Sequence, residues 1–153
     1  MRAFVIRILF AAAGVSWLPV TAWAENLTKV EYVGGTVAEL RPGEDVRIGL
    51  ADPSLLTLAT KQSRTGIFYS RINQLEYGQR IGRNLVGAIV ISPLFLLQKT
   101  RKHFVTLGFL DDQGRQQAVV IRVDKGDIRA LLAGLEARTG LRVHYQNDEA
   151  RKM

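Results

Sequence analysis

Short segments in which apolar and polar residues alternate are the strongest constraint on the fold of this chain. Val46, Ile48 and Leu50 alternate with Arg47 and Gly49, which is the period of a β-strand with one buried face. Similar segments recur along the chain and are separated by turn sequences. This pattern predicts a mainly β domain of antiparallel hairpins. The expected strands are residues 36–40, 46–50, 56–61, 67–69, 72–77, 104–110, 118–123 and 141–145.

The turn sequences carry specific backbone requirements. Arg41–Glu44 places proline at its second and glycine at its third position, as a type II turn requires. Asp111–Gly114 is typical of a hairpin loop, and we expect Gly114 in the left-handed conformation that closes it. Residues 51–54 and 62–66 are the other expected turns.

After the last long strand the period changes from two residues to that of a helix. Asp124 is the expected N-cap of this helix, and Gly140 is placed to end it in the left-handed conformation. The sequence therefore predicts one amphipathic C-terminal helix. Its apolar stripe, at positions i, i+3, i+4 and i+7, consists of Ile128, Leu131, Leu132 and Leu135.

The first 24 residues have the anatomy of a secretory signal peptide. Arg2 and Arg7 are basic, an apolar stretch follows, and Ala22–Ala24 offers small residues at a cleavage site. An uncleaved anchor is the alternative, because Phe4–Ala24 is nearly long enough to span a bilayer of ~30 Å. Pro19 breaks that helix. We therefore expect cleavage and an exported protein, either periplasmic or secreted.

The predicted organisation is a leader, one domain and a tail. Residues 1–24 form the signal peptide, 25–35 a lead-in, and 36–145 a single domain with an apolar insertion at 80–103, while 146–153 form a flexible tail. The chain contains no cysteine, so neither a disulfide nor a thiolate contributes. The formal net charge of +7 becomes +5 without the two leader arginines. Export argues against nucleic acid as a partner and leaves anionic lipid, acidic polymers or solubility alone as explanations.

The insertion at 80–103 is the most unusual part of the sequence. Its 13 central residues, Leu85–Leu97, carry no charge, and no acidic residue occurs between Glu76 and Asp111. As a straight helix these residues would be ~20 Å long, too short for a ~30 Å hydrocarbon core. Pro93 divides the stretch, so we expect a bent helical or hairpin-like element.

Three interpretations of the insertion remain open. It folds back into the domain core, it dips into one leaflet of the envelope membrane while its bases reach the phosphates, or it docks on a protein partner or second copy. Among the exposed alternatives, flanking bases without acids favour the membrane. The expected contact residues are Arg80, Arg83, Leu85, Ile89, Ile91, Leu94, Phe95, Leu96, Leu97, Lys99, Arg101 and Lys102.

Catalytic and metal-binding patterns are lacking in the sequence. The only histidines, His103 and His144, have no partner at metal-ligand spacing, and we expect an exposed histidine and a strand-end histidine. The Asp111–Asp112 pair is explained by its turn. No catalytic residue, metal or cofactor is therefore predicted, and an enzyme is not expected.

The order of elements resembles the pleckstrin-homology (PH) superfold, in particular its bacterial PH-like and GRAM-like relatives. The likeness is carried by IFYSRINQLEYG at 67–78, HFVTLGF at 103–109 and the helix end LEARTG at 135–140. It implies a partly open antiparallel barrel with one end closed by the helix, and a binding or scaffolding role. The basic cluster that grips phosphoinositides in many PH domains is missing, since only Arg41 and Arg47 lie near the first turn.

Overall fold

The computed structural model describes residues 27–79, 90–91 and 102–146. Within these ranges the chain is mainly β with one C-terminal α-helix, as the sequence predicts. A short 3₁₀ helix, η1 (Tyr69–Arg71), lies where the expected strands 67–69 and 72–77 meet. The other elements are β1 (Leu27–Gly35), β2 (Asp45–Gly49), β3 (Leu55–Ala59), β4 (Arg64–Phe68), β5 (Ile72–Gly78), β6 (Val90–Ile91), β7 (His103–Leu110), β8 (Gln116–Val123), α2 (Ile128–Thr139) and β9 (His144–Tyr145).

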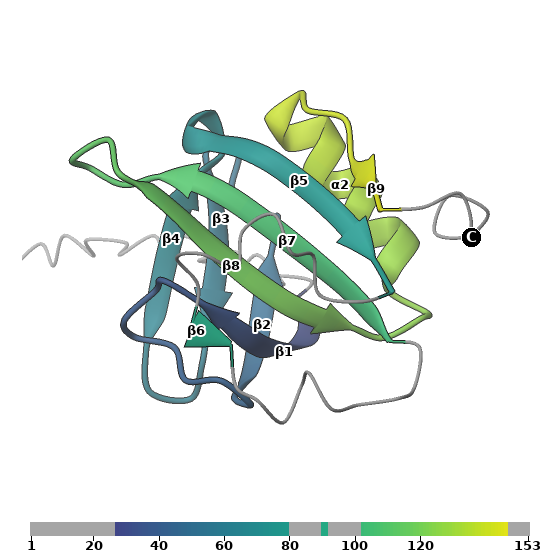
Figure 1. The fold of residues 1–153 in the computed structure, drawn as a ribbon, viewed down its shortest axis with the longest axis horizontal. Coiled ribbons are helices and arrows are strands. Elements are labelled where there is room, and N and C mark those ends of the chain that lie inside the picture. Colours follow the sequence, from purple (N-terminus) through teal and green to yellow (C-terminus); the bar gives the residue numbers. More distant parts are fainter. Residues whose placement is uncertain (1–26, 80–89, 92–101, 147–153) are drawn as a thin grey trace, which may run out of the picture.

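All nine strands of the described ranges belong to one sheet (Figure 1). Their order is β4-β3-β2-β1-β8-β7-β5-β9, and β6 pairs with β1 outside this path. Every pairing is antiparallel except that of β9 with β5. The pairing of β1 with β8 joins the meander β1–β4 to the strands β5, β7 and β8. The sheet is not closed, and β4 and β9 are its two ends.

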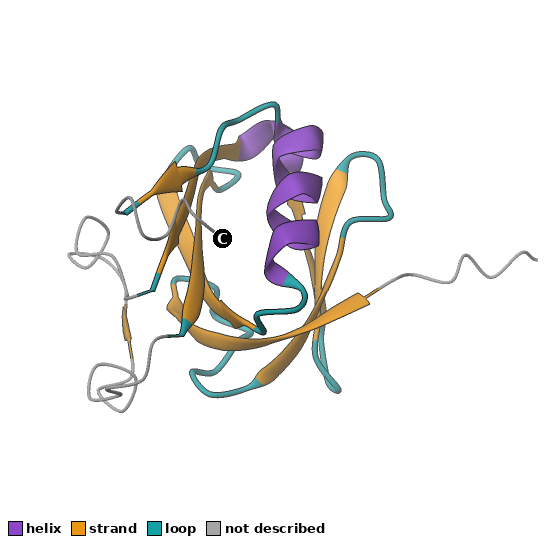
Figure 2. Ribbon diagram, turned by 90° about the vertical axis from the view of Figure 1, so that its right-hand side faces the viewer, coloured by secondary structure: helices purple, strands orange, loops and turns teal. Residues whose placement is uncertain are grey.

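The sheet curls around α2, which lies on its concave side (Figure 2). The predicted stripe of α2 is confirmed, because Ile128, Leu131, Leu132 and Leu135 are all buried in the main core. Burial of each side chain contributes about 1.5–3 kcal/mol. Gly140 ends the helix at φ 73°, as expected.

The predicted N-cap of this helix, Asp124, is wrong. The N-cap is Asp127, three residues later. The carbonyl of Asp124 accepts the main-chain N–H groups of Asp127 and Ile128 at 3.0 and 3.2 Å. A separate turn therefore precedes the helix and uses the residue that we expected to cap it.

Both specific turn predictions are confirmed. In the first turn, the N–H of Glu44 donates to the carbonyl of Arg41 at 3.0 Å, and Gly43 has φ 91°. In the second, the N–H of Gly114 donates to the carbonyl of Asp111 at 3.0 Å, and Gly114 has φ 74°.

The predicted lead-in is wrong, because Leu27–Gly35 is the central strand β1. A bulge between Tyr32 and Gly34 breaks its alternation, which is why the sequence pattern is weak there. Gly35 is needed for close packing rather than for a turn, since a Cβ atom at that position would lie 2.3 Å from the carbonyl oxygen of Ala118. The domain therefore includes residues from 27 onward.

Further boundaries differ from the prediction, among them the last strand, which is His144–Tyr145 rather than 141–145. Residues 36–40 form a turn instead of a strand, and β4 begins inside the expected turn, at Arg64. Val90–Ile91 is a short strand, so the helical prediction for the insertion is wrong at these two residues. Gln146, assigned to the flexible tail, donates its N–H to the carbonyl of Tyr77 at 3.0 Å. The signal peptide and residues 147–153 lie outside the described residues.

Candidate binding hollow

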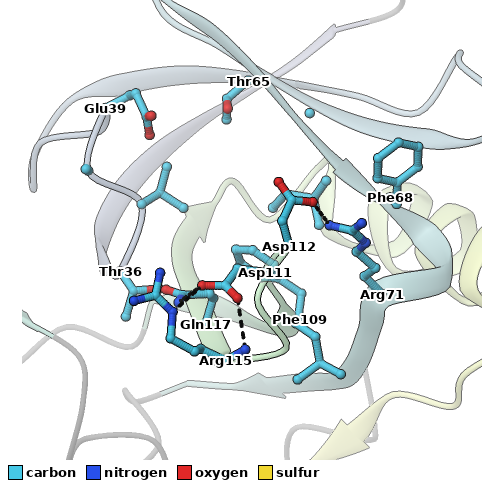
Figure 3. Close-up of a pocket in the computed structure, with 15 residues that line it drawn as sticks. Thr36, Glu39, Thr65, Phe68, Arg71, Phe109, Asp111, Asp112, Arg115 and Gln117 are labelled. Carbon is cyan, nitrogen blue, oxygen red and sulfur yellow. Dashed lines mark hydrogen bonds and ion pairs between the residues drawn. The ribbon is translucent and has the colours of Figure 1, made fainter.

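A hollow of about 380 Å³ lies between the edge strand β4, the β7–β8 hairpin and the loop after β1 (Figure 3). We call it the corner hollow. Its walls combine apolar side chains with paired charges. The residues that line it are Thr36, Val37, Ala38, Glu39, Thr65, Gly66, Ile67, Phe68, Arg71, Phe109, Leu110, Asp111, Asp112, Arg115 and Gln117.

The loop after β1 is fixed against β8 by main-chain and hydroxyl contacts. The N–H of Thr36 donates to the carbonyl of Ala118 at 2.9 Å, and the N–H of Ala118 donates to the Thr36 hydroxyl at 3.0 Å. Below the loop, burial raises the pKa of Tyr32 to about 12, against the opposing effect of a hydrogen bond with the Val37 main chain. This wall of the hollow is therefore held in place from both sides.

The hairpin wall is organised by the carboxylate of Asp111. One oxygen accepts the main-chain N–H groups of Gln113 and Arg115, both at 2.9 Å. The other accepts from Arg115 Nε at 2.8 Å and from Gln117 Nε2 at 2.9 Å. Desolvation alone would raise the pKa of Asp111, but the hydrogen bonds from Arg115 and Gln113 outweigh it and hold the pKa below its ordinary value. The tip of the hairpin is thus a preformed element.

Arg71 connects the opposite wall to the hairpin. Its guanidinium forms an ion pair with Asp112 and lies 5.2 Å from the ring centroid of Phe68 (Figure 3). Asp111 forms the second ion pair, with Arg115. Each ion pair contains one positive and one negative side chain, so the two pairs add no net charge to the hollow.

The hollow also contains exposed apolar surface beside a sheet edge. Among the described residues, the exposed large apolar side chains are Phe68, Leu110 and Tyr145, at 46%, 38% and 36% of their accessible surface. The first two line the hollow. Within the described ranges no strand pairs with the outer edge of β4, and such an edge is a template for pairing with another chain.

The contact residues predicted from the sequence lie elsewhere. Ile91 is in β6, and Lys102 is half-buried directly before β7. The other ten predicted contact residues lie outside the described residues, so the structure tests neither their exposure nor their contacts. Phe68 and Leu110 were not singled out from the sequence. The available signal was weak: each is a large apolar residue at the end of a strand segment.

The two histidines offer no metal site in the part of the chain that the structure describes, where no group of three or more His, Cys, Asp or Glu side chains could hold a metal ion. His144 is exposed and lies in the short strand β9. His103 is half-buried at the first residue of β7: its Nδ1 lies 2.7 Å from the hydroxyl of Tyr77, and the two rings stack. Among the described residues no helix is long and apolar enough to cross a membrane.

No protein-family model matches this chain, and no curated protein matches it. A functional assignment therefore depends on the geometry of the chain itself.

Proposed function

We propose that this chain is a non-enzymatic, PH-like binding module that holds an extended peptide against the edge strand β4. One observation carries the proposal. Four consecutive β4 residues, Thr65–Phe68, line a hollow that also contains two of the three large apolar side chains left exposed in the described ranges.

The arrangement of the elements supports the PH-like part of the proposal. A four-stranded meander, β1–β4, is followed by β5, β7 and β8, and the last of these returns to β1. One helix then packs on the concave side (Figure 2). The resemblance implied this order of strands before helix, together with a binding or scaffolding role. Fold alone does not assign a ligand.

The chemistry of the corner hollow favours a peptide as the ligand. An edge strand provides main-chain hydrogen bonds to an added strand, while neighbouring pockets select alternate side chains. Phe68 and Leu110 provide the apolar contacts. The paired charges of the hollow give no basic patch for a phosphate group. We therefore expect a largely apolar, extended segment as the ligand.

Selection from a random peptide library against the protein tests this proposal. Selected peptides should perturb the amide resonances of Thr65–Phe68, and Phe68→Ser and Leu110→Ser should each weaken binding about tenfold, because burial of a large apolar side chain contributes ~1.5 kcal/mol or more. The matched control is Tyr145→Ser, which removes an equally exposed apolar side chain from β9, outside the hollow. Peptides that bind equally to all three variants would overturn the proposal.

The peptide backbone provides an independent test. N-methylation at alternate positions of a selected peptide should abolish binding, because added strands bind through main-chain N–H and C=O groups. N-methylation at the intervening positions is the control and should be tolerated. Equal tolerance at every position would show that the peptide does not add a strand.

Export and membrane attachment remain predictions from the sequence. Loss of residues 1–24 from protein recovered outside the cytoplasm, measured by mass spectrometry, would establish the leader.

Flotation with anionic vesicles, abolished by Leu94→Asp with Phe95→Asp, would establish peripheral attachment through the insertion. Light scattering of a variant without Leu85–Leu97 tests the alternative of a scaffold or homo-oligomer: a change in oligomer size would support it.

A further inference from the structure

The edge strand β4 has a glycine at its centre, Gly66, that the described part of the fold does not require. Its φ is not positive, and the pairing of β4 with β3 contains no bulge. A Cβ atom at this position would make only ordinary contacts with the side chain of Leu55, at 3.5 Å or more. A glycine weakens the strand that contains it, and one reason for its presence is the close approach of a ligand.

The hydrogen bonds between β3 and β4 show which main-chain groups reach the outer edge. Directly after β4, the N–H of Tyr69 donates to the carbonyl of Ser54 at 3.0 Å. In an antiparallel pair, residues whose main-chain groups point to the partner strand alternate with residues whose groups point away. Ile67 therefore faces β3, as Tyr69 does, while Gly66 and Phe68 direct their N–H and C=O groups to the outer edge. The bond that closes the β3–β4 turn, at 2.8 Å, follows the same alternation.

The same two residues lie on the convex side of the sheet, which is the side away from α2. Ile67 belongs to the main core with α2, and successive residues of a strand point to opposite faces. Gly66 and Phe68 are both exposed, and both line the corner hollow.

A gap lies above Gly66 on this convex side. The ring of Phe68 stands two residues further along β4, and the side chain of its pairing partner Leu55 lies beside the glycine on β3. We call this gap the glycine slot. It has apolar walls, a main-chain floor and an open side at the outer edge of the strand.

We infer that the glycine slot is the specificity pocket of the peptide site, and that it takes an aromatic side chain from the peptide residue opposite Gly66. This inference rests on the proposed function. An antiparallel strand added at this edge exchanges two hydrogen bonds with Gly66, and the paired peptide residue then places its side chain on the convex side. Aromatic side chains fill the space above an edge glycine, and Phe68 lies at the diagonal position that an aromatic side chain reaches. The ligand class is therefore an extended peptide with Trp, Tyr or Phe at one fixed position.

Gly66→Val tests the inference, because valine suits a strand and its side chain fills the slot. For a selected peptide, replacement of the aromatic residue by alanine should weaken binding to the unmodified protein about tenfold. Against Gly66→Val the same replacement should change the affinity less than about threefold, and against Gly66→Ala by an intermediate factor. Isothermal titration measures each affinity, and amide spectra of the free variants establish that they are folded.

The matched control is Ala59→Val, which introduces the same side chain on the convex side of β3. Ala59 pairs with Arg64 and not with Gly66, so the slot stays open. The aromatic-to-alanine replacement should therefore still weaken binding to Ala59→Val about tenfold.

The register of the bound peptide provides a second test. In a hydrogen-bonded antiparallel pair, the two main-chain N–H groups lie close together. The N–H of Gly66 should therefore show its nuclear Overhauser contact with the N–H of the peptide's aromatic residue, and not with that of a neighbouring residue.

Two results would overturn the inference. One is a tenfold loss on removal of the aromatic ring in Gly66→Val as well as in the unmodified protein. The other is a set of selected peptides without an aromatic residue opposite Gly66. In both cases, peptides that still perturb the β4 amides and depend on Phe68 and Leu110 leave the proposed function intact. Peptides that bind away from β4 would overturn both proposals.

Discussion

The strand β2 and the strands β7 and β8 are buried in different ways. In β2, Val46 and Ile48 are buried while Arg47 between them is exposed, so this strand has one face in solvent. In β7 and β8, neighbouring residues such as Val120 and Ile121 are both buried. Strict alternation in the sequence therefore accompanies one exposed face in β2, and the unbroken apolar runs of β7 and β8 accompany burial on both faces.

A charge introduced on the convex face of the sheet should have the largest effect on the free energy of unfolding. Val120→Asp places a carboxylate where only 1% of the side chain is exposed, and we expect the free energy of unfolding to fall by about 4 kcal/mol or more. Arg47→Asp makes an acidic substitution on the wet face of β2 and should change it by less than about 0.5 kcal/mol. Urea unfolding measures both. Equal effects would show that β2 and β8 do not differ.

Removal of one aromatic ring, either from β7 or from β4, should have an intermediate effect on the free energy of unfolding. Phe104→Ala deletes a ring from the convex side of β7, where it is 5% exposed, and should lower the free energy of unfolding by about 3 kcal/mol. Phe68→Ala deletes a 46% exposed ring beside the hollow and should cost less than about 1 kcal/mol. Thermal unfolding compares the two directly. A small loss for Phe104→Ala would argue that this ring is not packed in the folded protein.

Titration of His103, which lies on the concave side of the sheet, should have the smallest effect on the free energy of unfolding. Burial, with a smaller contribution from Lys125, lowers the pKa of His103. The unfolded chain then binds the proton more readily, so the free energy of unfolding falls as the pH drops through about 6.5 towards the lower folded pKa. His103→Gln should remove this dependence in urea titrations between about pH 7 and pH 5, while His144→Gln should leave it in place. An unchanged pH dependence in His103→Gln would assign it to another group.

Much of the fold could be predicted because its signals are local. The type II turn at Arg41–Glu44, the hairpin at Asp111–Gly114 and the stripe of α2 each depend on residues close together in the sequence. The predictions that were wrong concern the pairing of strands that are far apart in the sequence. Nothing near Leu27–Gly35 shows that this segment lies between β2 and β8, and the close contact of Gly35 with Ala118 depends on that pairing.

The candidate site could hardly be predicted at all. The corner hollow brings together residues 36–39, 65–71 and 109–117, and only the tertiary fold places them side by side. Exposure of Phe68 and Leu110 is likewise a property of the sheet edge, not of their immediate neighbours. The sequence drew attention to the apolar insertion instead, because its composition is unusual, and composition does not show what a segment packs against.

The pairing of β1 with β8 has a consequence for how the chain acquires its structure. Thr36 and Ala118, which bond across this pair, are 82 positions apart, and such distant contacts slow folding because a long loop must close first. The two halves of the sheet cannot join until β8 has been synthesised. The fold is therefore expected to be completed only after most of the chain has been synthesised.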